Sequence, residues 1–476
     1  MSTTRNAAYV LSAQAALLLS GTIISVGLGR MLGPELYGKY GVVLAVATVL
    51  NVLLTPGLMQ AVAKHSAEKK EKAAGIASAV LRKQFIIGIA MAAAYFLLAI
   101  PLTGLLKDKT LLHMLWILAP MIIIYGTTAI LSGFLTGTGR FLEQSIQLVI
   151  YATSRLFLTF ILAYLFSITG AVAALPLASL LALIYAYKAA RIGKSEENNH
   201  TKEIYSLSIR LAIFSAIIAT FMNVDILMVK ALLGNDALTG YYTAASTIAR
   251  MPYFLLTALG TLMLPSVAEK LAMQGQQAQK FIRESIRYVL ILLIPGTVIV
   301  AATAKPLVML LYKSDYAQAA QPAATLAIGT AALTIAYLLS TALNASGKTR
   351  TTVTVAFIML IASVAANLYA IPQQGIKGAA ATVSAASIMA AAFLLVAAYK
   401  KFGNFISYKS LARITIASAI TFAAIKIMPL ENKFLLPIEY AALGIIYTAT
   451  LFALREINSS DIEKVKNIIP KKMAKA

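Results

Sequence analysis

The chain has 476 residues, of which 59% are hydrophobic and only 12% are charged, and its mean hydropathy is +0.80. That charge fraction is about half the value typical of soluble proteins, so the composition excludes a soluble globular fold and predicts a polytopic membrane protein. The absence of cysteine excludes disulfides and thiolate metal sites. The net charge of +23 lies in short clusters at the ends of apolar runs, which disfavours nucleic acid as a partner.

Fourteen apolar runs are long enough to cross a bilayer, for which a helix needs about 20 residues. The predicted fold is all-α, with two six-helix lobes related by pseudo-two-fold symmetry and two extra helices. The predicted spans are 7–31, 41–60, 84–106, 112–136, 143–166, 171–190, 207–233, 241–263, 287–311, 321–344, 352–371, 378–399, 409–428 and 435–455.

A polar stretch from Arg30 to Tyr40 joins the first two runs and contains Gly33–Pro34. Proline lacks the amide donor and restricts the residue before it, so the stretch predicts a turn between two helices. The same order of residue types recurs from Lys230 to Tyr242: a cation, Leu-Gly, an acid, Gly and Tyr. This recurrence indicates an internal repeat.

The repeat continues further along the chain. Leu131–Ser132 and Gly139 recur in the same order and spacing as Leu339–Ser340 and Gly347. Repeats that point the same way in a membrane place a substrate site between them. The predicted domains are an N-terminal six-helix lobe at 1–192, a cytoplasmic linker at 193–206, a C-terminal six-helix lobe at 207–401, helices 13 and 14 at 402–456, and a basic cytoplasmic tail at 457–476.

Positive residues predict the orientation, because Lys and Arg stay on the cytoplasmic side. Most of the 41 Lys and Arg residues flank the spans on the side that carries both termini. We expect a multi-pass protein of the prokaryotic inner membrane with both termini in the cytoplasm. The outer connections are short, so they leave no domain for catalysis and the chain is not expected to be an enzyme.

Polar residues recur at helical spacing on several spans, although a charge at the bilayer centre costs about 2.5–3.5 kcal/mol on insertion scales. Tyr151 and Arg155 share one such stripe, Thr247 and Arg250 share another, and Asn51 lies on a third. Such faces are expected to line water or ligand rather than lipid. Excess cations select an anion, and the arginine fork suits phosphate, so these five residues are predicted to bind the substrate.

Three further charged residues each have two interpretations. Arg30 and Lys230 stand near the outer ends of their helices, where they either bind the substrate or extend to the lipid headgroups. Asp225 is the one acid deep in a predicted span. It either serves as a coupling-ion site or neutralises a nearby cation such as Lys230 or Arg250.

No residue set points to catalysis, a metal or a cofactor. His65, His113 and His200 are scattered, without metal-ligand spacing. The turn from Gly137 to Arg140 follows no predicted strand and so differs from a phosphate loop. We predict no catalytic residue, no metal and no cofactor.

The residues from Arg30 to Tyr40 resemble the first helical hairpin of the polysaccharide transporter family. That family contains the Wzx-type lipid-linked oligosaccharide flippases, within the multidrug/oligosaccharidyl-lipid/polysaccharide exporter superfamily. Two six-helix copies with two extra helices are similar as well. The resemblance implies two bundles that open alternately to each side, and it assigns Arg30 to the arginine of the family's first hairpin.

The predicted function is a flippase that moves an isoprenoid-pyrophosphate-linked oligosaccharide to the outer leaflet for surface glycan biosynthesis. The expected partners are this lipid-linked oligosaccharide, membrane lipids and glycan polymerase or ligase proteins. One alternative is a cation-coupled drug exporter of the same superfamily, which would need intramembrane carboxylates. A different class, a membrane glycan polymerase or ligase or an assembly scaffold, stays open as well.

Overall fold

The computed structural model describes residues 2–192, 201–273, 275–405, 407–428 and 435–458. The described chain is helical throughout and contains no strand. In lipid every backbone polar group needs an internal partner, which helices provide. The helices are α1 (Ser2–Leu54), α2 (Pro56–Glu68), α3 (Ala73–Leu105), α4 (Leu111–Gly137), α5 (Phe141–Ala190), α6 (Thr201–Leu233), α7 (Asp236–Met273), α8 (Gly275–Ala302), α9 (Ala304–Leu311), α10 (Ala320–Ala345), α11 (Thr349–Phe402), α12 (Tyr408–Ile427) and α13 (Leu436–Ala453), with short 3-10 helices η1 (Lys70–Lys72) and η2 (Ser314–Ala319).

The predicted turn within the first hairpin is confirmed. α1 contains Gly33 in a left-handed conformation (φ 75°), followed by Pro34. The hydroxyl of Ser25 is hydrogen-bonded to that of Tyr37, twelve residues later. A straight helix would separate the two residues by about 18 Å, so the chain reverses direction at this turn.

Two more helices fold back in the same way. α5 breaks at Phe166 and Ser167, and α11 breaks at Gly375. Thr382 donates a hydrogen bond to Asn367, 15 residues earlier, which a straight helix does not allow. Among the described residues, ten helices are long and apolar enough to cross a membrane, including these three long ones.

The backbone repeats at the spacing that the sequence indicates. Gly139 and Gly347, which occupy equivalent positions in the two copies, both have a φ of +80°. Ser167 (φ 53°, ψ −140°) and Gly375 (φ 60°, ψ −141°) are a second equivalent pair with nearly the same backbone angles. The two copies that the sequence predicts therefore share the backbone conformation of these two turns. The count of fourteen spans and the pseudo-two-fold symmetry stay predictions.

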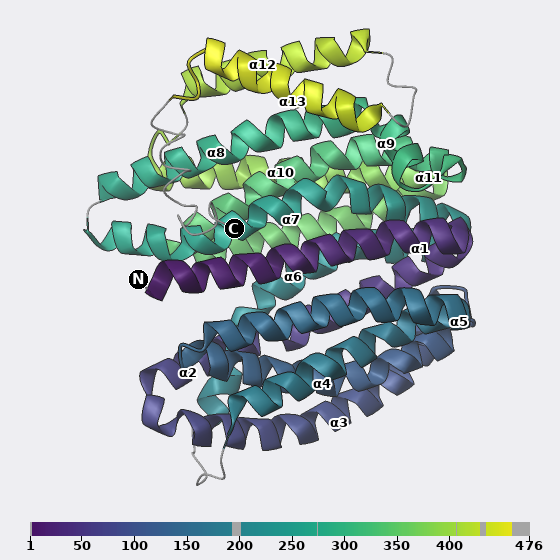
Figure 1. The fold of residues 1–476 in the computed structure, drawn as a ribbon, viewed down its shortest axis with the longest axis vertical. Helices are drawn as coiled ribbons and strands as arrows, with labels where there is room; N and C mark the ends of the chain where they lie inside the picture. Colours follow the sequence, from purple (N-terminus) through teal and green to yellow (C-terminus); the bar gives the residue numbers. More distant parts are fainter. Residues whose placement is uncertain (1, 193–200, 274, 406, 429–434, 459–476) are drawn as a thin grey trace.

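The helices run roughly parallel to one another (Figure 1). We call α1–α5 the first lobe and α6–α11 the second lobe; α12 and α13, drawn in yellow, lie at the edge of the second lobe. α6 packs against helices of both lobes, including α1, α2 and α11. It begins at Thr201, inside the predicted linker, whereas residues 193–200 and 459–476 of the predicted linker and tail lie outside the described residues.

Candidate functional site

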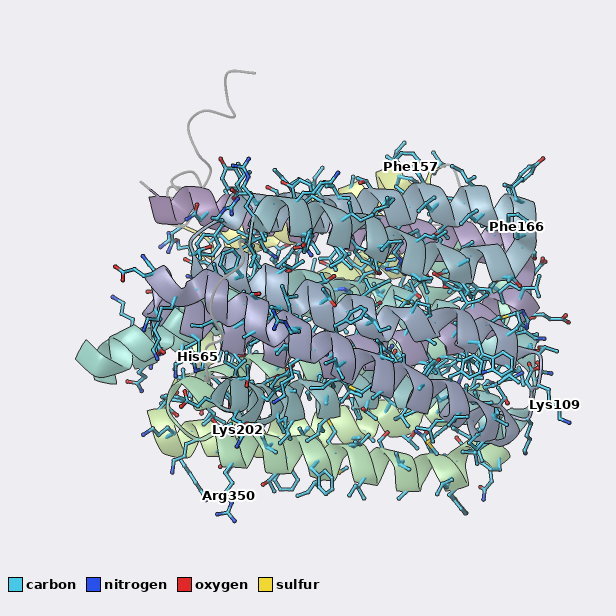
Figure 2. All side chains as sticks on the ribbon, turned by 90° about the horizontal axis from the view of Figure 1, so that it is seen from below. His65, Lys109, Phe157, Phe166, Lys202 and Arg350 are labelled. Atoms are coloured by element: carbon cyan, nitrogen blue, oxygen red, sulfur yellow. The ribbon has the colours of Figure 1, made fainter. Side chains whose placement is uncertain are left out.

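The helix bundle has two ends, which the labelled residues identify. Figure 2 places Lys109 at one end, and His65 and Lys202 at the opposite end. Lys39 of α1 donates a 2.7 Å hydrogen bond to Thr110, next to Lys109. We call this end, which carries the turn after Arg30, the Arg30 end, and we call the opposite one the His65 end.

Four charged side chains join the lobes at the Arg30 end. Lys39 and Asp108 belong to the first lobe, and Lys230 and Asp236 belong to the second; we call them the gate cluster. Lys230 Nζ lies 2.7 Å from Asp108 Oδ2, and Lys39 Nζ lies 3.6 Å from Asp236 Oδ2. Lys230 also contacts Asp236, and its side chain is only 2% exposed. Two ion pairs therefore cross from lobe to lobe.

The pKa of Asp108, which lies in the loop between α3 and α4, reflects the strength of the ion pairs in this cluster. Burial alone would raise its pKa, but hydrogen bonds from Lys230 and Thr110, together with the charge of Lys230, lower the pKa from 3.8 to about 2. The carboxylate also accepts from the Thr110 backbone N–H at 2.9 Å. Asp108 is therefore ionised at any physiological pH.

Glycines let the two backbones meet beside the gate cluster. A Cβ on Gly38 would lie 2.0 Å from the carbonyl oxygen of Asp236, and one on Gly240 would lie 1.9 Å from that of Pro34. Real Cβ atoms do not come so close to a backbone oxygen. Because only glycine fits at these positions, α1 and the start of α7 touch backbone to backbone.

Arg30 takes part in the same closure. Its Nε donates a 2.7 Å hydrogen bond to the Leu311 carbonyl, and Nη2 donates to the Leu310 carbonyl at the end of α9. Cations are favourable beside the carbonyls that end a helix. Lys313 Nζ in turn donates to the Arg30 carbonyl at 2.8 Å, so the first hairpin is tied to the second lobe.

Apart from the gate cluster, a cluster of hydroxyls also joins the two lobes. The Ser25 hydroxyl lies 3.0 Å from that of Thr247 and 3.4 Å from that of Tyr312. The hydroxyls of Tyr37 and Tyr312 are 3.2 Å apart. Thr247, predicted to bind substrate, therefore lies at the contact between the lobes.

Arg155 lies inside the first lobe, among tyrosines. Tyr40, Tyr125 and Tyr151 are the polar neighbours of its guanidinium. Its Nε is buried without a hydrogen-bond partner, and so is the hydroxyl of Tyr40. In the part of the chain that the structure describes, no carboxylate forms an ion pair with Arg155. Asn51 approaches the same cluster through Tyr125.

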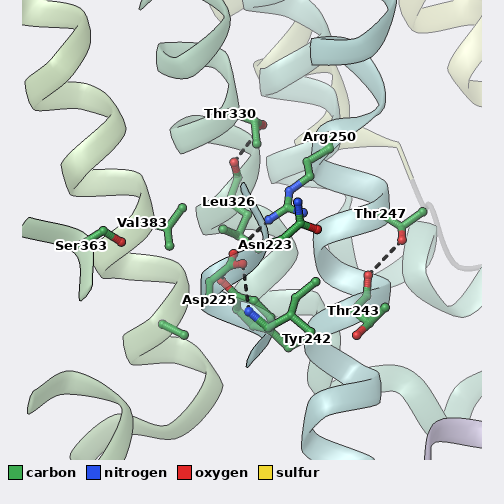
Figure 3. A network of polar contacts seen from close by, with 12 residues as sticks. Asn223, Asp225, Tyr242, Thr243, Thr247, Arg250, Leu326, Thr330, Ser363 and Val383 are labelled. Carbon is green, nitrogen blue, oxygen red and sulfur yellow. Dashed lines mark hydrogen bonds and ion pairs between the residues drawn. The ribbon is translucent and has the colours of Figure 1, made fainter. Parts of the chain in front are cut away.

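Arg250, by contrast, is neutralised inside the second lobe (Figure 3). Its Nη2 lies 2.9 Å from Asp225 Oδ2, which also accepts a 2.9 Å hydrogen bond from the Tyr242 hydroxyl. Asp225 is completely buried, and its Oδ1 accepts from the Ile226 N–H at 2.9 Å. The structure therefore pairs Asp225 with Arg250, one of the two cations named for it, and its role as a coupling-ion site stays a prediction.

The predicted site residues thus lie in separate places. Arg155, Tyr151 and Asn51 lie together in the first lobe, and Arg250 and Asp225 lie together in the second. Arg30 and Lys230 lie in contacts at the Arg30 end rather than beside them. Their assignment to substrate binding stays a prediction. Sequence reasoning missed Asp108, Asp236 and Lys39, whose only signal was a charge within the repeated turn or the short loop.

The His65 end carries an open pocket between the lobes. It measures about 430 Å³ and lies between α2 and α6. Its lining residues are Lys64, His65, Lys202, Glu203, Ser206 and Leu207. Among the described residues, no group of His, Asp and Glu is placed to hold a metal ion.

Known proteins share a sequence family and a fold with this chain. Residues 3–271 match the family described as polysaccharide biosynthesis protein. A search of curated protein sequences found no match. The structure resembles the lipid II flippase MurJ in its inward closed conformation, with a TM-score of 0.80 and 16% identity over 94% of this chain and 99% of that one.

Two structures of multidrug resistance transporters of the MATE family, which belongs to the MOP superfamily, are also similar. The inward-facing one has a TM-score of 0.70 and 13% identity, covering 84% of this chain and 98% of that one. The outward-facing one has a TM-score of 0.61 and 14% identity, covering 84% and 96%. These neighbours are transporters and flippases rather than enzymes. The chain therefore belongs to the polysaccharide biosynthesis protein family, and it is a multi-pass membrane protein with the fold of MOP-superfamily transporters.

Proposed function

We propose that this protein is a flippase that moves an isoprenoid-pyrophosphate-linked oligosaccharide from the cytoplasmic to the outer leaflet. The observation that carries the proposal is Arg155, a cation inside a membrane lobe that has hydroxyls around it and no acid paired with it in the described part of the chain. A buried charge without a counter-ion is costly. An anionic ligand removes that cost, and arginine binds phosphate oxygens with two N–H donors at once.

The surroundings of Arg155 suit a phosphate more than a carboxylate of the protein. The hydroxyls of Tyr40, Tyr125 and Tyr151 can each donate to a phosphate oxygen. The prenyl chain of such a substrate would stay in lipid, and its sugars would occupy the space between the lobes. The family description, polysaccharide biosynthesis protein, agrees with a glycan cargo.

Alternating access fits the closure of the lobes at the Arg30 end. The gate cluster and the Gly38–Gly240 contact join the lobes at the Arg30 end, and the pocket at the His65 end lies between α2 and α6. Positive residues favour the His65 end as the cytoplasmic one. The structure is also more similar to an inward-facing transporter than to an outward-facing one.

A cation-coupled drug exporter is less well supported. It would need an intramembrane carboxylate free to attract a cationic drug. The acid predicted for that role, Asp225, already carries Arg250 as its counter-ion. A glycan polymerase is disfavoured by the fold neighbours, which are transporters and flippases.

The experiment removes Arg155 and measures surface glycan. Arg155→Gln should lower export at least about tenfold, because a hydrogen bond to a charged group contributes about 1.5–3 kcal/mol. Arg155→Lys should be intermediate, since lysine keeps the charge but loses the planar fork. Export would be scored by complementation of a strain that lacks this protein, and the membrane level of each variant by immunoblot.

The matched control is Arg140→Gln. Arg140 precedes the first residue of the same helix, α5, but pairs with Glu143 at 3.0 Å and is 31% exposed. An exposed pair contributes little, so this variant should export normally. Normal export by Arg155→Gln at a normal membrane level would remove the basis of the proposal.

A further inference from the structure

The function proposed above assigns no role to Arg250, the cation in the ion pair of the second lobe. Asp225 is completely buried and takes three donors, namely Arg250, Tyr242 and the Ile226 N–H. The Arg250 side chain is 11% exposed, whereas that of Asp225 is not exposed at all. The pair is neutral as a whole, so an anion can bind Arg250 only by taking the place of the Asp225 carboxylate.

The surroundings of Asp225 leave few other groups to share its charge. Arg250 and Tyr242, both on α7, are its titratable neighbours. In the described part of α1, α2, α3 and α11, which also pack on α6, no charged residue forms an ion pair with Asp225. On the side of α11, Figure 3 labels Ser363 and Val383, neither of which titrates.

In the internal repeat, Asp225 has no acidic counterpart in the first lobe. Ser25 precedes Arg30 by the same spacing as Asp225 precedes Lys230, so Ser25 occupies the related position in the first lobe. Tyr40, next to Arg155, is related to Tyr242 in the aligned Gly-x-Tyr sequences. Each lobe therefore combines a tyrosine with an arginine, but only the second adds a carboxylate.

Loss of the arginine from such a carboxylate has a defined consequence. Breaking a buried ion pair leaves an uncompensated charge and costs about 3–5 kcal/mol. A buried carboxylate without its counter-ion avoids that cost by binding a proton. Any anion that recruits Arg250 therefore brings a proton to Asp225.

We propose that the pyrophosphate group of the cargo displaces Asp225 from Arg250 and that Asp225 takes up one proton as this happens. The inference rests on the proposed function, because it takes the anion to be an isoprenoid pyrophosphate. Arg250 stays protonated throughout, and a phosphate oxygen replaces the carboxylate as its acceptor. The proton comes from water and ends on the Asp225 carboxyl, so cargo binding in the second lobe is coupled to protonation.

The test measures proton uptake by the full-length protein in detergent. Farnesyl pyrophosphate is titrated at pH 7 in buffers of different ionisation enthalpy, and farnesol serves as the uncharged control ligand. The wild type should take up about one proton more per bound probe than Asp225→Asn. The probe itself gains or loses the same protons in both proteins, so the difference belongs to Asp225. Asp225→Asn should bind the probe at least as tightly as the wild type, and Arg250→Gln at least about tenfold more weakly.

Asp315→Asn is the matched acid-to-amide control, since Asp315 lies outside the gate cluster and its carboxylate accepts from the Ser314 hydroxyl. Its proton uptake should equal that of the wild type. Probe binding with equal uptake by the wild type and Asp225→Asn would overturn this inference and leave the proposed function standing. Failure of the wild type to bind farnesyl pyrophosphate would overturn both. If Asp225→Asn does not fold, Arg250→Gln takes its place, because its Asp225 has already lost the counter-ion; the wild type should then take up about one proton more per bound probe than Arg250→Gln.

Discussion

Neutralising Asp108 should weaken the closure of the Arg30 end. The gate cluster lowers the pKa of this carboxyl from 3.8 to about 2. A pKa change of one corresponds to about 1.4 kcal/mol, so the closed state favours the ionised form by about 2 kcal/mol. The Asp108 side chain is only 9% exposed and Lys230 is 2% exposed, so solvent screens this interaction little. Asp108→Asn should shift the closed-to-open ratio by roughly 30-fold.

The same pKa gives the pH dependence. Because the pKa of Asp108 is lowered in the closed state, its stabilisation is complete above about pH 4 and is lost as the pH falls from about 4 to about 2. Closure of the wild type should therefore not vary with Asp108 ionisation between pH 5 and 8. High salt should weaken it modestly, because buried pairs are screened less than exposed ones.

Cysteine labelling measures the opening, since the chain has no cysteine of its own. Thr247→Cys places a thiol at the contact between the lobes, beside Ser25. A membrane-impermeant maleimide added from the outer side should label this thiol about 30-fold faster when Asp108→Asn is also present. Asp315→Asn is the control, because Asp315 lies outside the gate cluster and its recorded partner is the Ser314 hydroxyl. Equal labelling with and without Asp108→Asn would refute the gate.

Two more substitutions test other contacts. Gly240→Ala should abolish export and speed Thr247→Cys labelling in the same assay, because the new Cβ would lie 1.9 Å from the Pro34 carbonyl oxygen. The control is Gly104→Ala, whose new Cβ would have nothing within 4 Å and should change neither export nor labelling. Glu456→Gln should lower the free energy of unfolding by about 3 kcal/mol, because this buried acid accepts a 2.7 Å hydrogen bond from Arg287 Nε. That hydrogen bond helps to hold α12 and α13 against α8. The control Glu143→Gln affects a more exposed pair and should cost less than about 1 kcal/mol. Thermal unfolding measures both, and equal losses would contradict the role of Glu456.

Local features of the fold were predictable from the sequence. Gly33–Pro34 marked a turn because its chemistry ends a helix wherever it lies, and the structure has its reversal there. The internal repeat indicated that Gly139 and Gly347 are equivalent, and the two residues share one backbone conformation. Arg155 drew attention because a charge in an apolar run needs a partner whatever the tertiary structure.

Contacts between distant residues were not predictable. Asp108 and Lys230 are far apart in the chain, and nothing in either local sequence says that they meet. Sequence reasoning therefore assigned Lys230 to the substrate, whereas its nearest partners are two acids. For Asp225 the alternatives were named correctly, but only packing could choose Arg250, on the following helix α7, over Lys230, which is much nearer in sequence and on the same helix as Asp225.

In the transport cycle that we propose, the difference between the lobes gives the two arginines different tasks. Two unpaired arginines would both bind the cargo tightly, and a pyrophosphate held from both sides would resist release when the lobes separate. Asp225 competes for Arg250, so the second lobe can give up the anion by recovering its own carboxylate, while Arg155 has no such competitor in the described part of the chain. In that proposed cycle the first lobe is expected to retain the cargo until the gate cluster opens, and the second lobe is expected to release it first.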